Sequence, residues 1–136
     1  MAEARFPADL AQLERVQTFI LAQLEGRAYT ERTRAKLDVA VEEIFVNIAR
    51  YAYPPGETGW VLVRCRVEED PSRVVVQFLD RGVPFDPLAK KDADTTLSAE
   101  ERGIGGLGIL MVKRSMDQVD YARQDGENIL TLTKHL

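Results

Sequence analysis

Hydrophobic side chains at helical spacing mark two helices in the first part of the chain. In residues 8–25 they recur every three or four positions, which predicts an amphipathic helix; they are Leu10, Leu13, Val16, Ile20 and Leu24. Gly26 is a typical stop signal for such a helix. Thr30 is a candidate N-cap for a second helix that continues to about Tyr53, because Pro54-Pro55-Gly56 cannot extend the hydrogen-bond ladder.

The pattern then changes to strict alternation, which is typical of strands. Residues 60–67 place Val61, Val63, Cys65 and Val67 on one face and arginines on the other, so they predict a half-buried strand. After a turn at residues 68–72, residues 73–80 form the expected hairpin partner. Two more strands, 117–123 and 127–134, are predicted around Asp125-Gly126, a common hairpin turn pair.

A polar stretch separates the two hairpins. Residues 81–102 are long for a connection in a compact domain, which favours a lid or a binding loop. A third helix is predicted from residue 104 to residue 116. The resulting order predicts an α+β two-layer sandwich, with the helices on one face of a mixed, mainly antiparallel sheet. We expect residues 1–136 to form a single domain.

Composition narrows the classes of function. The 136 residues are 45% hydrophobic and 29% charged, as in an ordinary globular protein, and the net charge of −4 argues against general nucleic-acid affinity. The single Cys65 excludes an internal disulfide framework, and the single His135 is a poor candidate for a catalytic triad. No apolar run has the length of a membrane span, and the start of the chain does not resemble a signal peptide, so we expect a cytoplasmic protein.

The second helix carries the first candidate chemistry. At about 100° per residue, its core face contains Leu37, Val41, Ile44 and Ile48. Glu43 and Asn47 lie four residues apart on the edge of that face, with Arg50 nearby. This edge is either an ordinary solvated flank or a site in which Asn47 offers an oxygen to Mg²⁺ and Glu43 acts as a general base. The adjacent Glu42 competes for the role of base but points toward solvent.

A second candidate lies at the end of the strand 73–80. Asp80 continues the parity of Val74, Val76 and Phe78, so a buried face would place its carboxylate in an apolar pocket. A buried carboxylate needs a partner, and the exocyclic amine of adenine is a suitable donor. Gly82 would allow the backbone to approach a ligand closely. The alternative interpretation is a simple turn, because aspartate, glycine and proline are common turn residues.

The third candidate is the glycine-rich segment Gly103-Ile104-Gly105-Gly106-Leu107-Gly108. A dinucleotide-binding motif is excluded because no strand precedes it, and the protein-kinase and Walker signatures are missing. Backbone N–H groups at the start of a helix can instead face phosphate groups, with Arg102 adding positive charge. The alternative is a flexible hinge.

Taken together, these motifs resemble those of the ATPases that include gyrase, sensor histidine kinases and mismatch-repair proteins. Residues 43–47 (EIFVN) resemble their N box, Asp80-Arg81-Gly82 the first glycine box, and residues 103–108 the second. The resemblance is strongest to the anti-sigma factor serine kinases and covers about residues 6–132. It departs at Arg50, near a position where those kinases often carry histidine.

This resemblance implies a histidine-kinase-like ATPase fold that binds ATP between the helices and a lid. It implies that Asp80 reads adenine, Asn47 holds Mg²⁺, Glu43 activates the acceptor and the glycine backbone wraps the phosphates. The implied cofactor contacts are Asn47, Arg50, Asp80, Gly82, Phe85, Arg102, Gly103, Ile104, Gly105, Gly106, Leu107, Gly108 and Thr131.

The function implied by the resemblance is serine phosphorylation of a STAS-type anti-sigma antagonist, combined with binding of a sigma factor. Two other hypotheses remain open at this point. One is an ATP-loaded switch that binds a partner without transferring phosphate, and the other is an interaction domain that binds no nucleotide. A homodimer is also expected, with no direct contact to nucleic acid or membrane.

Overall fold

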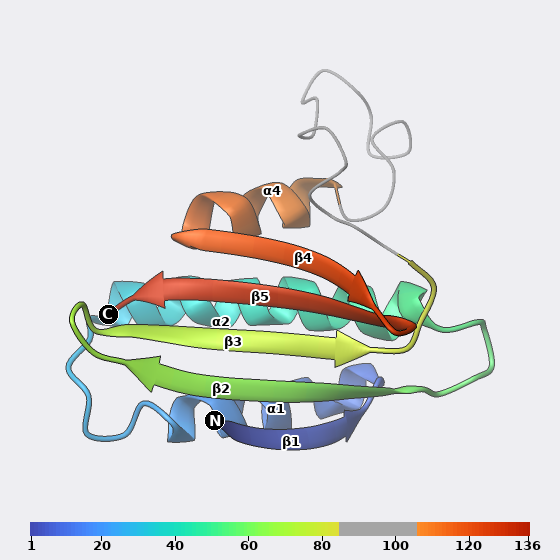
Figure 1. Cartoon of the computed structure of the whole chain (residues 1–136), viewed down its shortest axis with the longest axis horizontal. Helices are drawn as coiled ribbons and strands as arrows, with labels where there is room; N and C mark the ends of the chain where they lie inside the picture. Colours follow the sequence, from blue (N-terminus) through green and yellow to red (C-terminus); the bar gives the residue numbers. More distant parts are fainter. Residues whose placement is uncertain (85–105) are drawn as a thin grey trace.

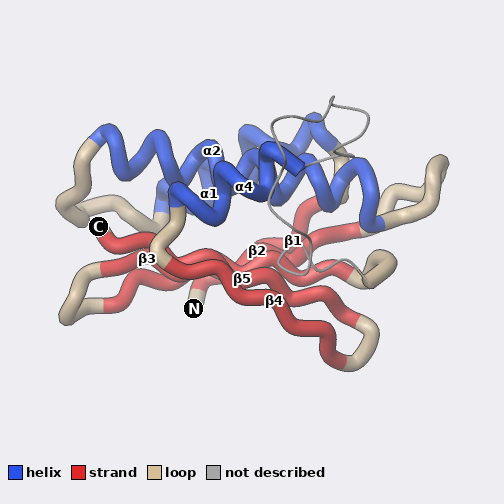
Figure 2. The backbone as a smooth tube through the Cα atoms, turned by 90° about the horizontal axis from the view of Figure 1, so that it is seen from above, coloured by secondary structure: helices blue, strands red, loops and turns tan. Residues whose placement is uncertain are grey.

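The computed structural model describes residues 1–84 and 106–136, with side chains described from residue 109 onward in the second part. These residues form two layers, in which helices α1 (Leu13–Ala22), α2 (Glu31–Asn47) and α4 (Gly106–Ser115) cover one face of a five-stranded sheet (Figures 1 and 2). The predicted α+β two-layer sandwich is therefore confirmed. Within the described residues, no helix combines the length and apolar character needed to cross a membrane.

The sheet has the order β1-β2-β3-β5-β4, and all four strand pairings are antiparallel. Its strands are β1 (Ala2–Pro7), β2 (Trp60–Glu68), β3 (Arg73–Asp80), β4 (Gln118–Gln124) and β5 (Glu127–His135). A mixed sheet was expected. The difference arises because the chain returns through α4 to form a second hairpin, and the second strand of that hairpin pairs with β3.

Strand β1 was not predicted from the sequence. The expected first helix began at residue 8, whereas the chain first forms this six-residue edge strand and then a short 3₁₀ turn at Leu10–Gln12. Alanine and glutamate are weak strand formers, so local preference gives little signal here. The strand forms because its backbone pairs with β2 over its whole length and because Phe6 is buried in the core.

Helix α2 spans the middle of the molecule and packs against α1, α4 and the sheet. The Thr30 side chain accepts a hydrogen bond from the Thr33 N–H at 3.1 Å, which confirms the predicted N-cap. The predicted core face is buried and extends further than expected, because Ala40 and Phe45 are buried as well.

The end of this helix differs from the sequence prediction. The chain was expected to continue as one α-helix to about Tyr53, but α2 ends at Asn47 and a π-helical turn follows at Ile48–Ala52. A π-helical turn changes the direction in which the next side chains and carbonyl groups point. Here the Ala52 carbonyl accepts a hydrogen bond of 2.8 Å from the Val83 N–H, which ties the helix end to the segment after β3.

The predicted hairpins are confirmed. Strand β3 has the predicted bounds, and β2 is one residue longer than expected. Asp125 and Gly126 both have positive φ, of 53° and 79°, as a two-residue hairpin turn requires. Alternation along β5 then sends Leu130 and Leu132 into the core and Thr131 to the opposite face of the sheet.

Candidate functional site

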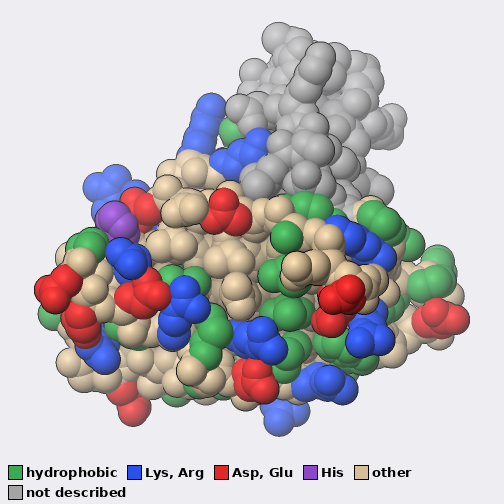
Figure 3. Space-filling model, viewed as in Figure 1, with side chains coloured by type: hydrophobic (Ala, Val, Ile, Leu, Met, Phe, Trp, Pro, Cys, Tyr) green, Lys and Arg blue, Asp and Glu red, His purple; other side chains and the backbone are tan. Residues whose placement is uncertain are grey.

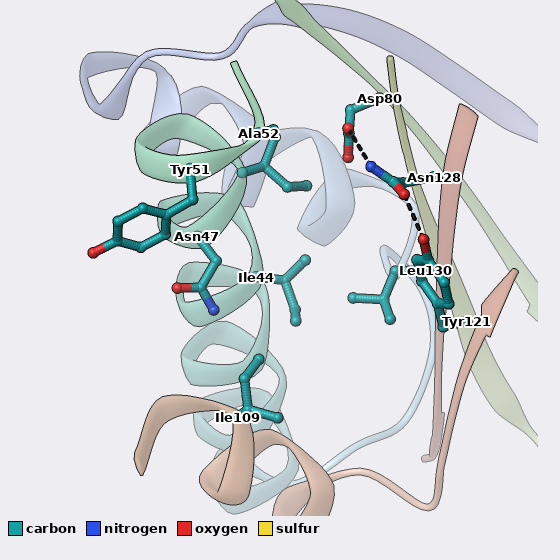
Figure 4. Close-up of a pocket in the computed structure, with 10 residues that line it drawn as sticks. Ile44, Asn47, Tyr51, Ala52, Asp80, Ile109, Tyr121, Asn128 and Leu130 are labelled. Carbon is teal, nitrogen blue, oxygen red and sulfur yellow. Dashed lines mark hydrogen bonds between the residues drawn. The ribbon is translucent and has the colours of Figure 1, made fainter. Parts of the chain in front are cut away.

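A pocket lies between the C-terminal part of α2 and the sheet, with α4 contributing one wall (Figure 4). Its empty space is about 430 Å³ when the solvent at its open mouth is included. Its walls are mainly apolar, and a few polar groups converge on it. The lining residues are Ile44, Asn47, Ile48, Tyr51, Ala52, Asp80, Ile109, Tyr121, Asn128 and Leu130.

Asp80 supplies a buried carboxylate to this pocket. It is only 4% exposed, and it ends β3 on the core side of the sheet, as the alternation predicted. Its Oδ1 accepts hydrogen bonds from the Gly82 N–H at 2.9 Å and from Asn128 Nδ2 at 3.0 Å. Burial raises the pKa of this carboxyl above its ordinary value, while the two hydrogen bonds and the charge of Arg123 oppose the rise.

Gly82 lies where no other residue fits. A Cβ atom at this position would meet the backbone oxygen of Ala52 at 2.2 Å, far inside van der Waals contact. The glycine therefore lets the segment after β3 pack directly against the end of the helix layer. This supports the interpretation of Asp80-Arg81-Gly82 as part of a built pocket rather than as a free turn.

Asn47 lines the pocket from the opposite wall. It is 8% exposed, and its Nδ2 is buried without a hydrogen-bond partner among the described residues. An unpaired buried amide is costly, so this side chain is the natural place for a ligand to bind. Because the two ends of a carboxamide are nearly isosteric, a half-turn would present its oxygen at the same position.

Glu43 and Arg50 are placed less centrally than Asn47. Glu43 is half-buried on α2, one helical turn before Asn47, and Glu42 is exposed, which agrees with the preference for Glu43. Neither Glu43 nor Arg50 lines the pocket. Arg50 is exposed on the π-helical turn, so the described structure does not bring its guanidinium into the site.

Thr131 was expected to contact the cofactor, but it does not line this pocket. It pairs with Gln77, whose Nε2 donates to the Thr131 hydroxyl at 3.3 Å, on the face of the sheet away from the helices. The residue of β5 that faces the pocket beside Asp80 is Asn128, three positions earlier. A shift by an odd number of residues reverses the face of a strand.

Asn128 is the main polar residue that sequence reasoning missed. It is 5% exposed and lies directly across from Asp80 in the sheet. Sequence reasoning also missed Tyr121 and Arg123, which donate hydrogen bonds to Asn128. It missed Tyr51 as well, which lines the pocket. One signal was available: Asn128 has the same parity as the core residues Leu130 and Leu132, so alternation alone places it inward.

Several predicted contacts lie outside the described residues. These are Phe85, Arg102, Gly103, Ile104 and Gly105. Gly106, Leu107 and Gly108 form the first turn of α4, as the predicted third helix requires, and only their backbone is described.

In the part of the chain that the structure describes, an apolar pocket is lined by the buried Asp80 carboxylate and by the Asn47 amide, whose nitrogen lacks a partner there. This arrangement suits a flat ring carrying an N–H donor. Comparison with known families agrees with this. The model of the histidine kinase-like ATPase domain matches residues 6–134. The chain belongs to this family.

Curated proteins from several bacteria are similar to this chain. Serine/threonine-protein kinase BtrW of Bordetella bronchiseptica is 28% identical over 107 residues, which cover 79% of this chain and 74% of that protein. Serine-protein kinase RsbW of Listeria monocytogenes is 30% identical over 104 residues, covering 74% of this chain and 64% of the relative. In Bacillus pumilus, serine-protein kinase RsbW is 27% identical and covers the whole of this chain and 86% of the relative. The resemblance to the serine kinases is thus confirmed.

Solved structures show the same fold. The RsbU and RsbW domains of a Mycobacterium tuberculosis protein superpose on the whole of this chain with a TM-score of 0.67 at 16% identity. The histidine kinase domain of a blue-light activated kinase from Erythrobacter litoralis superposes on 96% of it with a TM-score of 0.59 at 18% identity. This chain spans 33% of the first of those chains and 62% of the second.

Proposed function

We propose that this protein is an ATP-dependent protein-serine kinase that phosphorylates a STAS-type anti-sigma antagonist and also binds a sigma factor. The observation that carries the proposal is the Asp80 carboxylate, 4% exposed in an apolar pocket of a histidine kinase-like ATPase domain. Relatives that are named serine-protein kinases support the choice of serine as acceptor. We further propose that residues 1–136 act as one cytoplasmic ATPase domain.

Recognition of the base rests on Asp80. In the proposed complex its ionised carboxylate accepts a hydrogen bond from the exocyclic amine of adenine, and the apolar walls contact the ring. GTP carries a carbonyl oxygen at the corresponding position of its base. An oxygen facing a buried carboxylate leaves both groups without a donor, so GTP binds far more weakly.

Asn47 is the proposed residue for Mg²⁺, which would neutralise charge on the phosphates. The residue fits this role because its amide is buried in the pocket wall and its Nδ2 has no hydrogen-bond partner among residues 1–84 and 109–136. In the metal-bound form the side-chain oxygen would face the cation. A neutral oxygen ligand is suitable where phosphate groups already supply the negative charge.

Phosphoryl transfer needs a group that removes the acceptor proton. We propose that Glu43, half-buried one turn before Asn47, takes the proton of the serine hydroxyl. The serine oxygen then bonds to the γ-phosphorus while the bond between that phosphorus and the β,γ-bridging oxygen breaks, so ADP leaves. Positioning and electrostatics supply most of the rate enhancement in such transfers.

The glycine-rich segment completes the proposed ATP site. We propose that the backbone of residues 103–108 wraps the phosphates, aided by Arg102 and by the start of α4 at Gly106. Phe85 is the proposed contact from the start of the loop. Arg50 has an exposed side chain, so we propose that it contacts the phosphates or the acceptor protein from the rim of the pocket.

The first test is calorimetric titration with ATP plus Mg²⁺, using GTP and the Asp80→Asn variant as controls. Wild-type protein should bind ATP, and binding should be lost with GTP or in the variant. The variant keeps an oxygen that can accept the Gly82 and Asn128 hydrogen bonds, so it should fold normally. If the wild type fails to bind ATP, the chain is an interaction domain that uses this fold only as a scaffold.

The second test separates a kinase from a switch. The protein is incubated with ATP and a purified STAS-type antagonist, and the mass of the intact antagonist is measured by mass spectrometry. A gain of one phosphate that disappears in Glu43→Ala supports the kinase mechanism. ATP-dependent complex formation without any gain in mass would instead establish the ATP-loaded switch.

We also propose a homodimer that forms through the uncovered face of the sheet. Leu62, Leu79, Ile129 and Ala122 form a cross-strand row on this face. Hydrophobic side chains gather there among charged ones (Figure 3). Light scattering at micromolar concentration should give twice the monomer mass, and a monomer mass would refute this part of the proposal.

A further inference from the structure

Asn128 uses all of its hydrogen-bonding capacity on other parts of the protein. Its Nδ2 donates to Asp80 Oδ1 at 3.0 Å and to the Val83 carbonyl at 2.8 Å. Its Oδ1 accepts from the Tyr121 hydroxyl and from Arg123 Nη1, the latter at 3.1 Å. A carboxamide offers two donors and one acceptor with two lone pairs, so nothing is left for a ligand.

The orientation of this amide is fixed by chemistry. Arginine can only donate and a backbone carbonyl can only accept, so the oxygen of Asn128 must face Arg123 and its nitrogen must face Val83. The nitrogen therefore faces Asp80 as well. Figure 4 shows the resulting chain of contacts from Tyr121 through Asn128 to Asp80, on the sheet side of the pocket.

The same residues hold the backbone that follows Asp80. Arg123 Nη1 also donates to the Gly82 carbonyl at 2.9 Å, and the Gly82 and Val83 N–H groups bond to Asp80 and to the Ala52 carbonyl. All four backbone polar groups of Gly82 and Val83 thus have partners in the pocket wall. The carboxylate cannot turn or shift without breaking several of these bonds.

We propose that Asn128, held by Tyr121 and Arg123, is a positioning residue that presents the Asp80 carboxylate to the bound base. This inference rests on the proposed function, because it assigns Asp80 to the base of ATP. Asn128 directs both of its amide hydrogens away from the ligand, to Asp80 Oδ1 and to Val83. The described hydrogen bonds to Asp80 all reach Oδ1, so Oδ2 is the oxygen offered to the exocyclic amine.

The network also acts on the charge of Asp80. Among the described residues, the groups that influence its ionisation are Arg123 from β4, which favours the carboxylate, and Glu127 from β5, which disfavours it. Burial raises the pKa of the Tyr53 hydroxyl, beyond the π-helical turn, and the nearby charge of Asp80 adds to this rise. Burial raises the pKa of Asp80, and the Asn128 bond and Arg123 counteract this. Losing either should therefore move the pKa of Asp80 further up.

The test is the pH profile of ATP binding, measured by calorimetry from about pH 5.5 to pH 9 on the full chain. Since the carboxylate form binds the amine, affinity falls as pH drops through the pKa of Asp80. Arg123→Met should weaken binding by about tenfold at the acidic end, because the pKa of Asp80 rises when the positive charge is lost, and by much less at pH 9. The phosphates of ATP titrate equally in every sample. The ratio of the variant's affinity to that of the wild type therefore reports only the contribution of the protein.

Three further variants separate the effect of the Arg123 charge from the effects of the hydrogen bonds to Asn128. Arg123→Lys keeps the positive charge near Asp80, so it should recover most of the acidic affinity. Tyr121→Phe removes one donor to Asn128 and should shift the profile less than Arg123→Met. Asn128→Asp places a second carboxylate beside Asp80 and should abolish binding at neutral pH. The control variant, Arg64→Met, should keep the wild-type profile.

Arg64 suits this control because it lies on the uncovered face of the sheet and pairs with Glu3, away from the pocket. Arg123 is exposed, so its replacement should leave the melting temperature nearly unchanged. A loss of affinity that is equal at every pH, or wild-type profiles in Arg123→Met and Asn128→Asp, would overturn the positioning role. Absence of ATP binding in the wild type would instead refute the proposed function itself.

Discussion

At the scale of single residues, the site depends on groups that look ordinary in the sequence. Asp80 and Gly82 have the composition of a turn, and only their surroundings distinguish them from one. The carboxylate is buried between β5 and the helix layer, and the glycine lies against the Ala52 carbonyl. Each position is therefore restricted by a contact with a residue distant in the chain.

Gly82 provides a test of this restriction. Gly82→Ala places a Cβ atom at 2.2 Å from the Ala52 oxygen, so the backbone must shift and the 2.8 Å bond from Val83 must weaken. We expect the free energy of unfolding to fall by about 1–3 kcal/mol in urea denaturation. Adding Ala52→Gly should not restore it, because the nearest obstacle is backbone. Wild-type stability in Gly82→Ala would contradict this packing.

At the scale of secondary structure, the end of α2 is the element that decides the site. The sequence pattern predicts a uniform α-helix to Tyr53. In such a helix, the directions of the Tyr51 and Ala52 side chains would follow from the regular rotation of about 100° per residue. The π-helical turn at Ile48–Ala52 instead lets these two residues line the pocket while the Ala52 carbonyl accepts from Val83. Such turns occur frequently at functional sites.

The opposite end of α2 allows a prediction that separates stability from binding. Thr30→Ala removes the acceptor of the 3.1 Å bond from the Thr33 N–H, so the free energy of unfolding should fall by about 1 kcal/mol. Thr30→Ser keeps the hydroxyl and should stay near wild type in the same urea titration. ATP affinity should be unchanged in both, since the pocket lies at the other end of the helix; a loss of affinity in Thr30→Ala would show that the helix transmits the change.

At the scale of the whole molecule, the pocket joins parts of the chain that are far apart in sequence. Its walls come from α2, the π-helical turn, β3, α4 and the β4–β5 hairpin. A ligand in such a pocket contacts both layers at once. Binding should therefore stabilise the fold as a unit rather than one element of it.

Thermal unfolding tests this coupling. With Mg²⁺ and ATP at about 100 times the dissociation constant, the free energy of unfolding should rise by about 2.7 kcal/mol, and the melting temperature should rise with it. GTP at the same concentration should give a much smaller shift, and Asp80→Asn should respond to neither nucleotide. Equal shifts with ATP and GTP would argue against recognition of the base by Asp80.

Elements whose signals are local could be predicted from the sequence. The Thr30 cap, the apolar stripe of α2, the strand at residues 73–80 and the Asp125-Gly126 turn each follow from neighbours within a few positions, and the structure has all of them. Alternation along β3 also placed Asp80 on the buried face. These predictions succeed because helix periodicity, capping and turn geometry are short-range effects.

The way in which these elements meet depends on long-range pairing and packing. Strand β1 exists through its pairing with β2, and Asp80 meets Asn128 because the register between β3 and β5 sets which side chains face each other. The π-helical turn likewise belongs to the contact between Ala52 and the segment after β3. Register and packing join residues tens of positions apart, so no local pattern in the chain encodes them.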